Sequence, residues 1–527
     1  MRRPDSIDHI VIVGGGSAGW LTAGLLAGAY RLGPDSPLRI TLIESPDVQT
    51  VGVGEGTWPT MRSTLQRIGI AEPDFLTACS ASFKQGTRFD GWCTGRDEDR
   101  YYHPFTAPAG YASLNLAPHW QEVGGSADFA HAVTPQAALC DRDLAPKQLE
   151  SPGYAGLVNY GYHLDAGRFA ALLTEHCTTR LGVRHVPDHV VAVNSAPNGD
   201  IASLATAASG DIEGDLFIDC TGSRARLLGE HFGIGFIDRR DVLFNDTALA
   251  VQVPYAAATD PVASQTVSTA LAAGWVWDIA LNSRRGVGYT YSSAHTTDDE
   301  AERLLREYVA RTAPAADLGV RRISFRPGHR AAFWHRNCVA VGMAAGFIEP
   351  LEASALVLIE LAGRMLAEEL PANRPVMDIV ARRFNETFRY RWDRIIDFLK
   401  LHYVLSRRDG SDYWRDHRDP AGIPASLQDG LELWRHRAPW HRDFPQRDEV
   451  FSSASYQYVL YGMGFRTASA RYPIRADRAN EAARLLEENV KRTSQLVGML
   501  PSNRDILSFI GQGGSARLSA PDSAAAR

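Results

Sequence analysis

Several features that mark common classes of protein are missing from this sequence. No apolar run approaches the roughly 20 residues that a bilayer-spanning helix needs. The first residues lead into a predicted strand, without the apolar stretch of a secretory signal. The net charge of −6 gives no positive excess that would attract nucleic acid or an anionic membrane. We therefore expect a cytoplasmic protein whose partners include neither nucleic acid nor a membrane.

Cysteine is scarce and is not paired along the sequence. The chain has 6 cysteines in 527 residues, and none of them forms a CxxC pair. A metal site or a disulfide framework needs cysteines or histidines at characteristic spacings. We therefore expect reduced thiols and no metal site. The cysteines are Cys79, Cys93, Cys140, Cys177, Cys220 and Cys338.

A glycine-rich turn near the N-terminus has the spacing of a dinucleotide-binding fingerprint. Residues 7–13 read as a buried strand, an apolar helix begins at Trp20, and a second strand over 38–43 ends at Glu44. In such a unit the glycines allow a tight turn and a close approach to pyrophosphate, while the acid accepts hydrogen bonds from ribose. The alternative is a turn that only happens to precede a helix. The predicted cofactor-binding residues of this unit are Gly14, Gly16, Ser17, Ala18, Gly19 and Glu44.

The chain has one such unit and no second glycine fingerprint followed by an acid. A single dinucleotide site favours FAD as the resident cofactor, with reducing equivalents arriving from outside. Two later strands, over 215–220 and 338–343, end in turns that could reach the cofactor again, and Gly342 and Phe347 are the residues we assign there. A core strand and its loop is the alternative for the second of these segments.

From about residue 355 the apolar periodicity becomes mostly helical. The predicted fold class is α/β: a Rossmann-type FAD-binding body, similar to that of flavin monooxygenases, with a mainly helical C-terminal region. We place the body at 1–375 and the helical subdomain at 376–511. The tail over 512–527 is small and polar, and we expect it to be disordered.

Several segments together resemble the flavin-dependent tryptophan halogenases. They include the fingerprint, Val53-Gly54-Glu55-Gly56-Thr57, Ser82-Phe83-Lys84-Gln85-Gly86, Tyr102-His103-Pro104-Phe105, Gly274-Trp275-Val276-Trp277-Asp278-Ile279 and Pro350-Leu351-Glu352. The tryptophan-rich run separates these halogenases from related monooxygenases. The resemblance implies that reduced FAD, supplied by a separate flavin reductase, reacts with dioxygen and then with chloride or bromide to give hypohalous acid. It also implies that Val53 contacts the cofactor.

In the family, an essential lysine holds the oxidant beside the aromatic ring, and Lys84 matches that lysine. A fixed nitrogen donor supplies the regiochemistry that free hypohalous acid does not have. Burial would favour the neutral amine that a haloamine route requires. A solvated surface lysine is the alternative, and the nearby Phe83, Phe89 and Trp92 argue against it.

The resemblance assigns the family's essential glutamate to Glu352, where a carboxylate can stabilise the cationic ring and remove its proton. The alternative is a helix-start glutamate that the helix dipole favours. Backbone N–H groups at Ser354 and Ala355 would bind the halide. Trp275 and Trp277 share one face of a strand and would wall the flavin off from the substrate, or serve simply as core aromatics.

His103 and Phe105 would sandwich an indole ring. Three departures from the family pattern concern other positions: Ala280 replaces the usual proline, 353–355 read Ala-Ser-Ala where well-studied members have Ser-Thr-Gly, and no glutamate follows the tyrosines of 455–465. Members acting on free tryptophan use such a glutamate to hold the amino acid part. We therefore expect indole, a substituted indole, or tryptophan within something larger, and weak recognition of ammonium and carboxylate.

Two other functions stay open on the same scaffold. A flavin monooxygenase would hydroxylate an aromatic ring without halide and would not need Lys84. A non-catalytic or reductase-like flavoprotein would bind FAD and give no oxygen-dependent product. A monomer and a homodimer both stay open for the assembly.

Overall fold

The computed structural model describes residues 6–32, 36–48, 54–122, 128–313, 318–446, 448–468 and 476–514. The chain packs as two compact units whose segments alternate along the sequence. Unit 1 comprises 1–79, 164–240 and 325–392, and unit 2 comprises 80–163, 241–324 and 393–527. The division predicted at residues 375 and 511 stays a prediction, and most of the predicted disordered tail lies outside the described residues.

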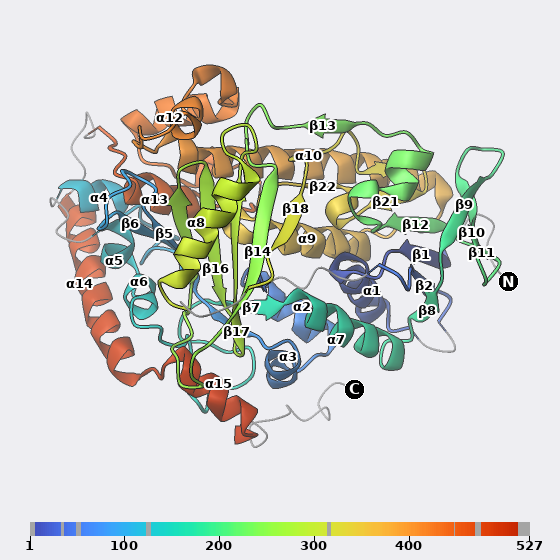
Figure 1. The fold of residues 1–527 in the computed structure, drawn as a ribbon, viewed down its shortest axis with the longest axis horizontal. Coiled ribbons are helices and arrows are strands. Elements are labelled where there is room, and N and C mark those ends of the chain that lie inside the picture. Colours follow the sequence, from blue (N-terminus) through green and yellow to red (C-terminus); the bar gives the residue numbers. More distant parts are fainter. Residues whose placement is uncertain are drawn as a thin grey trace. The chain divides into compact units, whose positions relative to one another are not determined.

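Unit 1 is built on a six-stranded sheet in the order β20-β21-β12-β1-β2-β8 (Figure 1). All neighbouring strands are parallel except β20 and β21. Every residue of β1 is buried, as expected for a central parallel strand covered on both faces. The strands are β1 (His9–Val13), β2 (Arg39–Glu44), β8 (Arg184–Pro187), β12 (Leu216–Asp219), β20 (Trp334–His335) and β21 (Cys338–Ala340).

The helix that follows the glycine turn, α1 (Ser17–Tyr30), lies among three other helices of unit 1. It packs against α2 (Thr60–Ile68), α7 (Ala166–Thr179) and α9 (Ser354–Glu368). Nine consecutive residues of α1, from Gly19 to Ala27, are buried, which fits a helix that is apolar on every side. The predicted βαβ unit and the helix after residue 355 are therefore confirmed.

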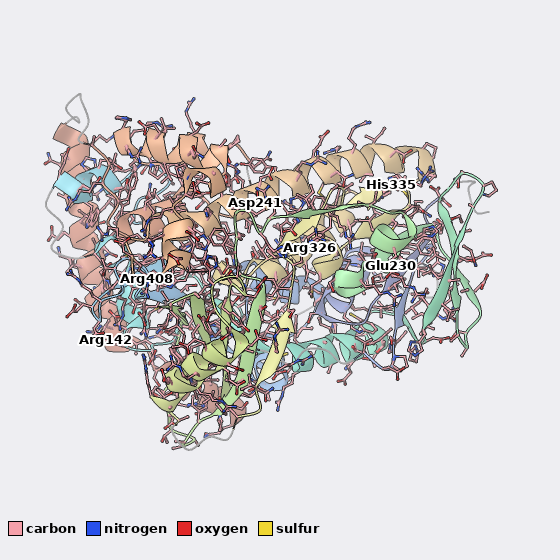
Figure 2. All side chains as sticks on the ribbon, turned by 45° about the horizontal axis from the view of Figure 1, so that its top comes forward. Arg142, Glu230, Asp241, Arg326, His335 and Arg408 are labelled. Atoms are coloured by element: carbon pink, nitrogen blue, oxygen red, sulfur yellow. The ribbon has the colours of Figure 1, made fainter. Side chains whose placement is uncertain are left out.

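Unit 1 also contains two three-stranded sheets. One sheet contains β9 (Val190–Ser195), β10 (Ile201–Thr206) and β11 (Asp211–Glu213), which do not join the main sheet. The other sheet contains β13 (Phe236–Asp238), β19 (Gly328–Arg330) and β22 (Gly346–Phe347). Arg326, labelled in Figure 2, donates to Asp238 at 2.9 Å and ties the segment before β19 to β13.

Unit 2 contains a seven-stranded sheet in the order β18-β14-β17-β16-β15-β5-β6. Only β15 and β5 run parallel within it. The helix α8 (Asp298–Ala310) packs on β14 and β17, and the Thr297 side chain caps it by accepting from the Glu300 N–H. The strands are β5 (Gly86–Asp90), β6 (Arg100–Pro104), β14 (Thr247–Pro254), β15 (Thr266–Leu271), β16 (Gly274–Ala280), β17 (Arg284–Tyr291) and β18 (Arg321–Ser324).

Unit 2 also contains several helices, which form much of its C-terminal part. The helix α13 (Ser453–Gly462) packs on β6, and α14 (Ala476–Met499) packs on the short helices α5 (Phe129–Val133) and α6 (Gln136–Cys140). Arg408, labelled in Figure 2, donates to the Gly91 carbonyl at 2.5 Å and lies 5.1 Å from the ring of Trp414. The mainly helical C-terminal region is confirmed, with α10 (Arg374–Val404) as its longest described helix.

Candidate functional site

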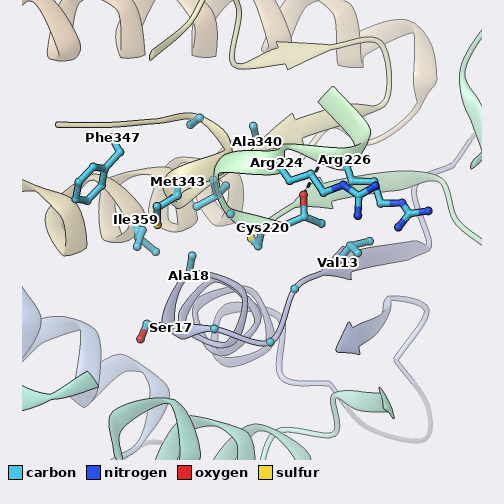
Figure 3. Close-up of a pocket in the computed structure, with 18 of the residues that line it drawn as sticks. Val13, Ser17, Ala18, Cys220, Arg224, Arg226, Ala340, Met343, Phe347 and Ile359 are labelled. Carbon is cyan, nitrogen blue, oxygen red and sulfur yellow. Dashed lines mark hydrogen bonds between the residues drawn. The ribbon is translucent and has the colours of Figure 1, made fainter. Parts of the chain in front are cut away.

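A cavity of about 650 Å³ opens in unit 1 beside the glycine turn. Its walls come from the start of α1, the end of β2, the turn after β12, the turn η3 (Gly342–Ala344) and the start of α9. Ligand pockets of this kind typically measure roughly 300–1,000 Å³, so the volume suits an extended cofactor. Figure 3 shows Ser17 and Ala18 on one side of the cavity, with Met343 and Ile359 across from them.

The three glycines of the fingerprint have different structural roles. Gly14 has φ +114°, and a Cβ there would lie 2.2 Å from the Cys220 carbonyl oxygen. A Cβ on Gly19 would lie 1.9 Å from the Gly14 carbonyl oxygen, so Gly19 is needed for the fold itself. A Cβ on Gly16 would meet nothing within 4 Å. Because Gly16 lines the cavity at the N-terminus of α1, the open space beside it fits an anion such as pyrophosphate.

Glu44 ends β2 and lines the cavity, as the ribose-binding prediction requires. Its Oε2 lies 2.9 Å from Nε2 of His185, a residue of β8 that the sequence did not single out. The ring of His185 packs edge-on against Trp20, with ring centres 5.0 Å apart, so the imidazole beside the carboxylate is itself fixed. No local pattern marks His185, because it reaches Glu44 only through the pairing of β2 with β8.

The two later segments that we expected to reach the cofactor do line the cavity. Cys220 and Gly222 follow β12, and Gly342 and Phe347 follow β21. A Cβ on Gly342, which has φ +68°, would lie 2.7 Å from the Cβ of Ala18, so this glycine permits close packing of the two turns.

Two cationic side chains also line the cavity, and the sequence did not single them out. Figure 3 shows Arg224 and Arg226 at the end near Val13. Arg224 pairs with Glu230 at 2.6 Å, and Arg226 donates to the Val191 carbonyl at 3.1 Å. Arg224 ends the short helix η1 (Gly222–Arg224) after β12, and Arg226 begins the next helix η2 (Arg226–His231). The predicted polar turn after β12 was the available signal.

Glu55, in β3 (Gly54–Gly56), also lines the cavity. Burial, with a smaller contribution from the charge of Asp165, raises the pKa of this carboxyl to about 7. Val53, which we expected to contact the cofactor, lies outside the described residues.

Glu352 occupies a sharply turned segment before α9. It has φ +62°, the next residue Ala353 has φ +55°, and the carboxylate-bearing residue is only 6% exposed. The Glu352 carbonyl accepts a hydrogen bond from the Trp58 indole N–H at 2.9 Å. The following residues Ser354 and Ala355, the predicted halide ligands, line the same cavity in unit 1 as the glycine turn.

In unit 2, Lys84 ends β4 (Ser82–Lys84) and is 1% exposed. Surface exposure, the alternative for this lysine, is thereby excluded. Its Nζ lies 5.4 Å from the centre of the Phe105 ring, which immediately follows β6. The structure therefore brings together two residues that the sequence assigned to substrate chemistry.

An aromatic cluster surrounds His103, the other predicted indole-binding residue. Its ring centre lies 5.6 Å from Phe398, 6.4 Å from Phe451 and 6.1 Å from Tyr458. Tyr458 comes from the tyrosine-rich stretch noted in the sequence and donates to the Thr106 carbonyl at 2.7 Å. Phe398 and Phe451 stack on each other with ring centres 3.8 Å apart, a contact between distant segments that no sequence pattern signals.

Trp275 and Trp277 lie on β16 of unit 2 with their side chains on one face, as predicted. Their ring centres are 6.3 Å apart, and the residues are 1% and 7% exposed. Trp275 also contacts Trp92, with ring centres 6.1 Å apart, so the pair extends into a larger aromatic core. Core packing is therefore part of what both tryptophans do.

The described residues contain no helix with the length and apolar character needed to cross a bilayer. Among those same residues, no group of three or more His, Cys, Asp or Glu side chains is placed to hold a metal ion.

Comparisons with a family model and with curated proteins indicate the same family. The family model described as tryptophan halogenase matches residues 9–478. Among curated proteins, the chain is 33% identical to the tryptophan 6-halogenase SttH of Streptomyces toxytricini, over 97% of this chain and 99% of that protein.

Comparison with solved structures indicates the same family. A tryptophan halogenase from Shewanella frigidimarina NCIMB 400 is 50% identical, with a TM-score of 0.94 over 97% of this chain and 98% of that one. Tar14, described as a tryptophan C-6 flavin-dependent halogenase (chlorinase) from taromycin biosynthesis, is 32% identical, with a TM-score of 0.89 over 96% of this chain and 100% of that one.

Proposed function

Since the chain belongs to the family of flavin-dependent tryptophan halogenases, we propose that it uses reduced FAD, dioxygen and chloride or bromide to halogenate an indole ring. The observation that carries the proposal is the burial of Lys84 with its amine facing the ring of Phe105 at 5.4 Å. A buried amine beside an aromatic wall is suited to deliver an oxidised halogen to another aromatic ring.

The cavity of unit 1 is the proposed FAD site. Gly16 and the first N–H groups of α1 would face the pyrophosphate, and Glu44, which lies beside His185, would face the adenosine ribose. Bound in its reduced form, FAD supplies the two electrons with which dioxygen and halide become hypohalous acid and water. Because the protein shows one such fingerprint, a separate flavin reductase is the proposed source of reduced flavin.

Lys84 is proposed to take up the halogen from hypohalous acid. Its neutral amine and HOX give Lys84–NHX and water. The N–X bond then breaks as the halogen transfers to a ring carbon, and the nitrogen takes up the proton that the ring loses, which restores the amine. Burial disfavours the ammonium form of a lysine and so promotes this reaction. The rigid strand that carries Lys84 restricts which ring carbon it reaches.

Glu352 is proposed to stabilise the ring cation and accept its proton. The left-handed backbone at Glu352 and Ala353 costs of order 1–3 kcal/mol at each residue. Strain of this kind persists at functional sites because the surrounding contacts hold it, here including the bond from Trp58. The N–H groups of Ser354 and Ala355 at the start of α9 are the proposed halide ligands.

Indole, a substituted indole, or tryptophan within a larger molecule is the proposed substrate class. The aromatic cluster around His103 supplies ring faces for stacking. The Tyr458 hydroxyl donates to the Thr106 carbonyl. Because its proton is committed to that bond, this position favours an apolar ring over a charged amino acid group.

The test supplies a flavin reductase, NADH, FAD and either chloride or bromide with a panel of indoles. Product is followed by mass spectrometry for the halogen isotope pattern. Halide-dependent halogenated product is expected. Hydroxylated product that forms without halide would instead establish the monooxygenase alternative, and no oxygen-dependent product would establish the non-catalytic one.

Two variants test whether halogenation requires Lys84 itself or is lost whenever a buried lysine of unit 2 is replaced. Lys84→Met should still oxidise reduced flavin and give no halogenated ring. Lys147→Met is the matched control, because Lys147 is also buried in unit 2, at 4% exposed, and donates to the Pro152 carbonyl. It should retain halogenation, and full halogenation by Lys84→Met would overturn the proposal.

A further inference from the structure

Beside Lys84 lies a buried histidine that the proposed mechanism does not use. His163 lies on β7 (Gly161–Asp165), opposite Ser82 of the antiparallel strand β4, and Lys84 lies opposite Gly161. Directly paired residues of antiparallel strands point to the same face, so Ser82, His163 and Lys84 share one. Lys84 is therefore a diagonal neighbour of His163, at a spacing that long and aromatic side chains bridge.

Hydrogen bonds fix the ring of His163, which is fully buried. Ser82 donates its hydroxyl proton to the Ala280 carbonyl at 2.5 Å, so its oxygen faces the ring Nδ1 at 3.5 Å as an acceptor. The ring Nε2 lies 2.9 Å from the Thr266 hydroxyl. With the proton on Nδ1, Nε2 accepts from Thr266, and a second proton on Nε2 would only require that hydroxyl to rotate and accept.

The groups that act on His163 come from each element packed against it. Burial lowers the pKa of His163 well below its usual value, and the charge of Lys84 on β4 lowers it further. The Ala280 carbonyl on β16 acts in the opposite direction, and Thr266 on β15 contributes a neutral hydroxyl. The His163 imidazole is therefore neutral while Lys84 is an ammonium. Once Lys84 loses its positive charge, the proton affinity of His163 rises.

We propose that His163 is a positioning residue that accepts the proton Lys84 releases when its amine takes up halogen. The proposal rests on the proposed function of Lys84. In the first step, Lys84–NH3+, HOX and neutral His163 give Lys84–NHX, water and protonated His163. The halogen then transfers to the ring carbon, and the ring proton, first accepted by Glu352, ends on the nitrogen that lost the halogen. This gives Lys84–NH2, which takes its remaining proton back from His163.

The pair thus carries one charge throughout, and a second buried charge, which would be costly, never forms. Lys84 can then be an ammonium at rest and still react as an amine, with no exchange of protons with bulk water. Without His163, the amine must lose its proton to solvent first, and its reaction rate must follow the neutral fraction.

The test measures the haloamine directly. The enzyme turns over reduced FAD with halide and no aromatic substrate, small molecules are removed, and protein-bound oxidising equivalents are titrated with iodide. Between about pH 6 and 9, the wild-type rate should be nearly independent of pH, whereas the rate of His163→Gln should fall about tenfold for each unit that the pH is lowered. Glutamine can still bond to Thr266 but does not titrate, so a merely structural role would lower the rate equally at every pH.

Two further variants complete the design. Thr266→Val removes the hydroxyl that must receive the imidazolium proton and should shift the profile in the same direction, which keeps the test available if His163→Gln does not fold. His417→Gln is the matched control, because His417 is another fully buried histidine of unit 2 and lies 3.1 Å from the amine of a buried lysine, Lys400. Its profile should equal that of the wild type.

The outcomes separate the two proposals. A wild-type profile in both His163→Gln and Thr266→Val, or in Thr266→Val alone if the other does not fold, would overturn the role of His163 and leave that of Lys84 intact. Bound oxidant that persists in Lys84→Met would overturn the function proposed for Lys84 itself.

Discussion

The indole N–H of Trp58 donates to the main-chain carbonyl of Glu352 at 2.9 Å, across 294 residues of sequence. Glu352 is held at φ +62°, a conformation that a non-glycine residue adopts only when its surroundings impose it. The bond from Trp58 is one such constraint on the backbone that positions the carboxylate.

Replacing Trp58 by phenylalanine should therefore loosen Glu352 without emptying the core. A hydrogen bond contributes about 1 kcal/mol net, so we expect kcat for halogenation to fall about fivefold. Trp334→Phe is the control. The indole N–H of Trp334 also donates to a main-chain carbonyl, that of Arg336 at 3.0 Å, but this bond is local to β20 and the residues after it. An unchanged kcat in Trp58→Phe would show that other contacts hold the turn.

The glycine turn offers a pair of variants with opposite expectations. Gly16→Ala adds a Cβ to open space in the cavity, so the fold should be unaffected while FAD affinity falls at least about tenfold, or 1.4 kcal/mol. Gly19→Ala places the Cβ 1.9 Å from the Gly14 carbonyl oxygen and should destabilise the protein before any cofactor binds. Fluorescence titration with FAD and thermal unfolding of the apoprotein measure the two effects. Equal effects from both variants would contradict the proposed position of the pyrophosphate.

Ala353 has φ +55°, a conformation that glycine adopts without the steric cost of a Cβ. Ala353→Gly should raise the apparent melting temperature, with a gain of about 0.5–1 kcal/mol. Ala345→Gly, at a helical φ of −78°, should instead lower it by a similar amount. Differential scanning calorimetry on both variants checks the sign, and a stability loss in Ala353→Gly would show that the strain lies elsewhere.

Glu360 on α9 gives unit 1 a predictable pH dependence. It is fully buried and accepts hydrogen bonds from Thr60 and Thr64, and burial raises its pKa from 4.5 to about 7. The folded state therefore binds this proton more tightly than the unfolded state. The stabilisation that this bound proton gives the folded state is complete below about pH 4.5 and is lost as the pH rises through about 7. The loss amounts to up to about 3 kcal/mol of the free energy of unfolding.

Glu360→Gln should remove that loss, so the variant should gain stability relative to the wild type between about pH 5 and 8. Glu368→Gln, an exposed position on the same helix, is the control and should follow the wild type. Parallel pH dependence of melting temperature in wild type and Glu360→Gln would show that another group dominates.

Local patterns in the sequence were sufficient for the dinucleotide unit. The strand, the Gly14, Gly16 and Gly19 spacing, the helix and Glu44 all lie within one short stretch, and each is set by its own steric or periodic requirement. The long helices after residue 355 were equally readable, because a helix shows its periodicity within a few turns. The family resemblance added Lys84 and Glu352, which no local pattern distinguishes from other lysines and glutamates.

Only the tertiary structure decided which residues accompany these groups. His185 meets Glu44 through the pairing of β2 with β8, His163 joins the face of Lys84 through the register of β7 with β4, and Trp58 reaches Glu352 from a distant segment. The interleaving of the two units was likewise invisible, because it depends on which strands pair rather than on which residues form strands. Strand pairing joins positions far apart in the chain, and composition and periodicity within one segment carry no information about that choice.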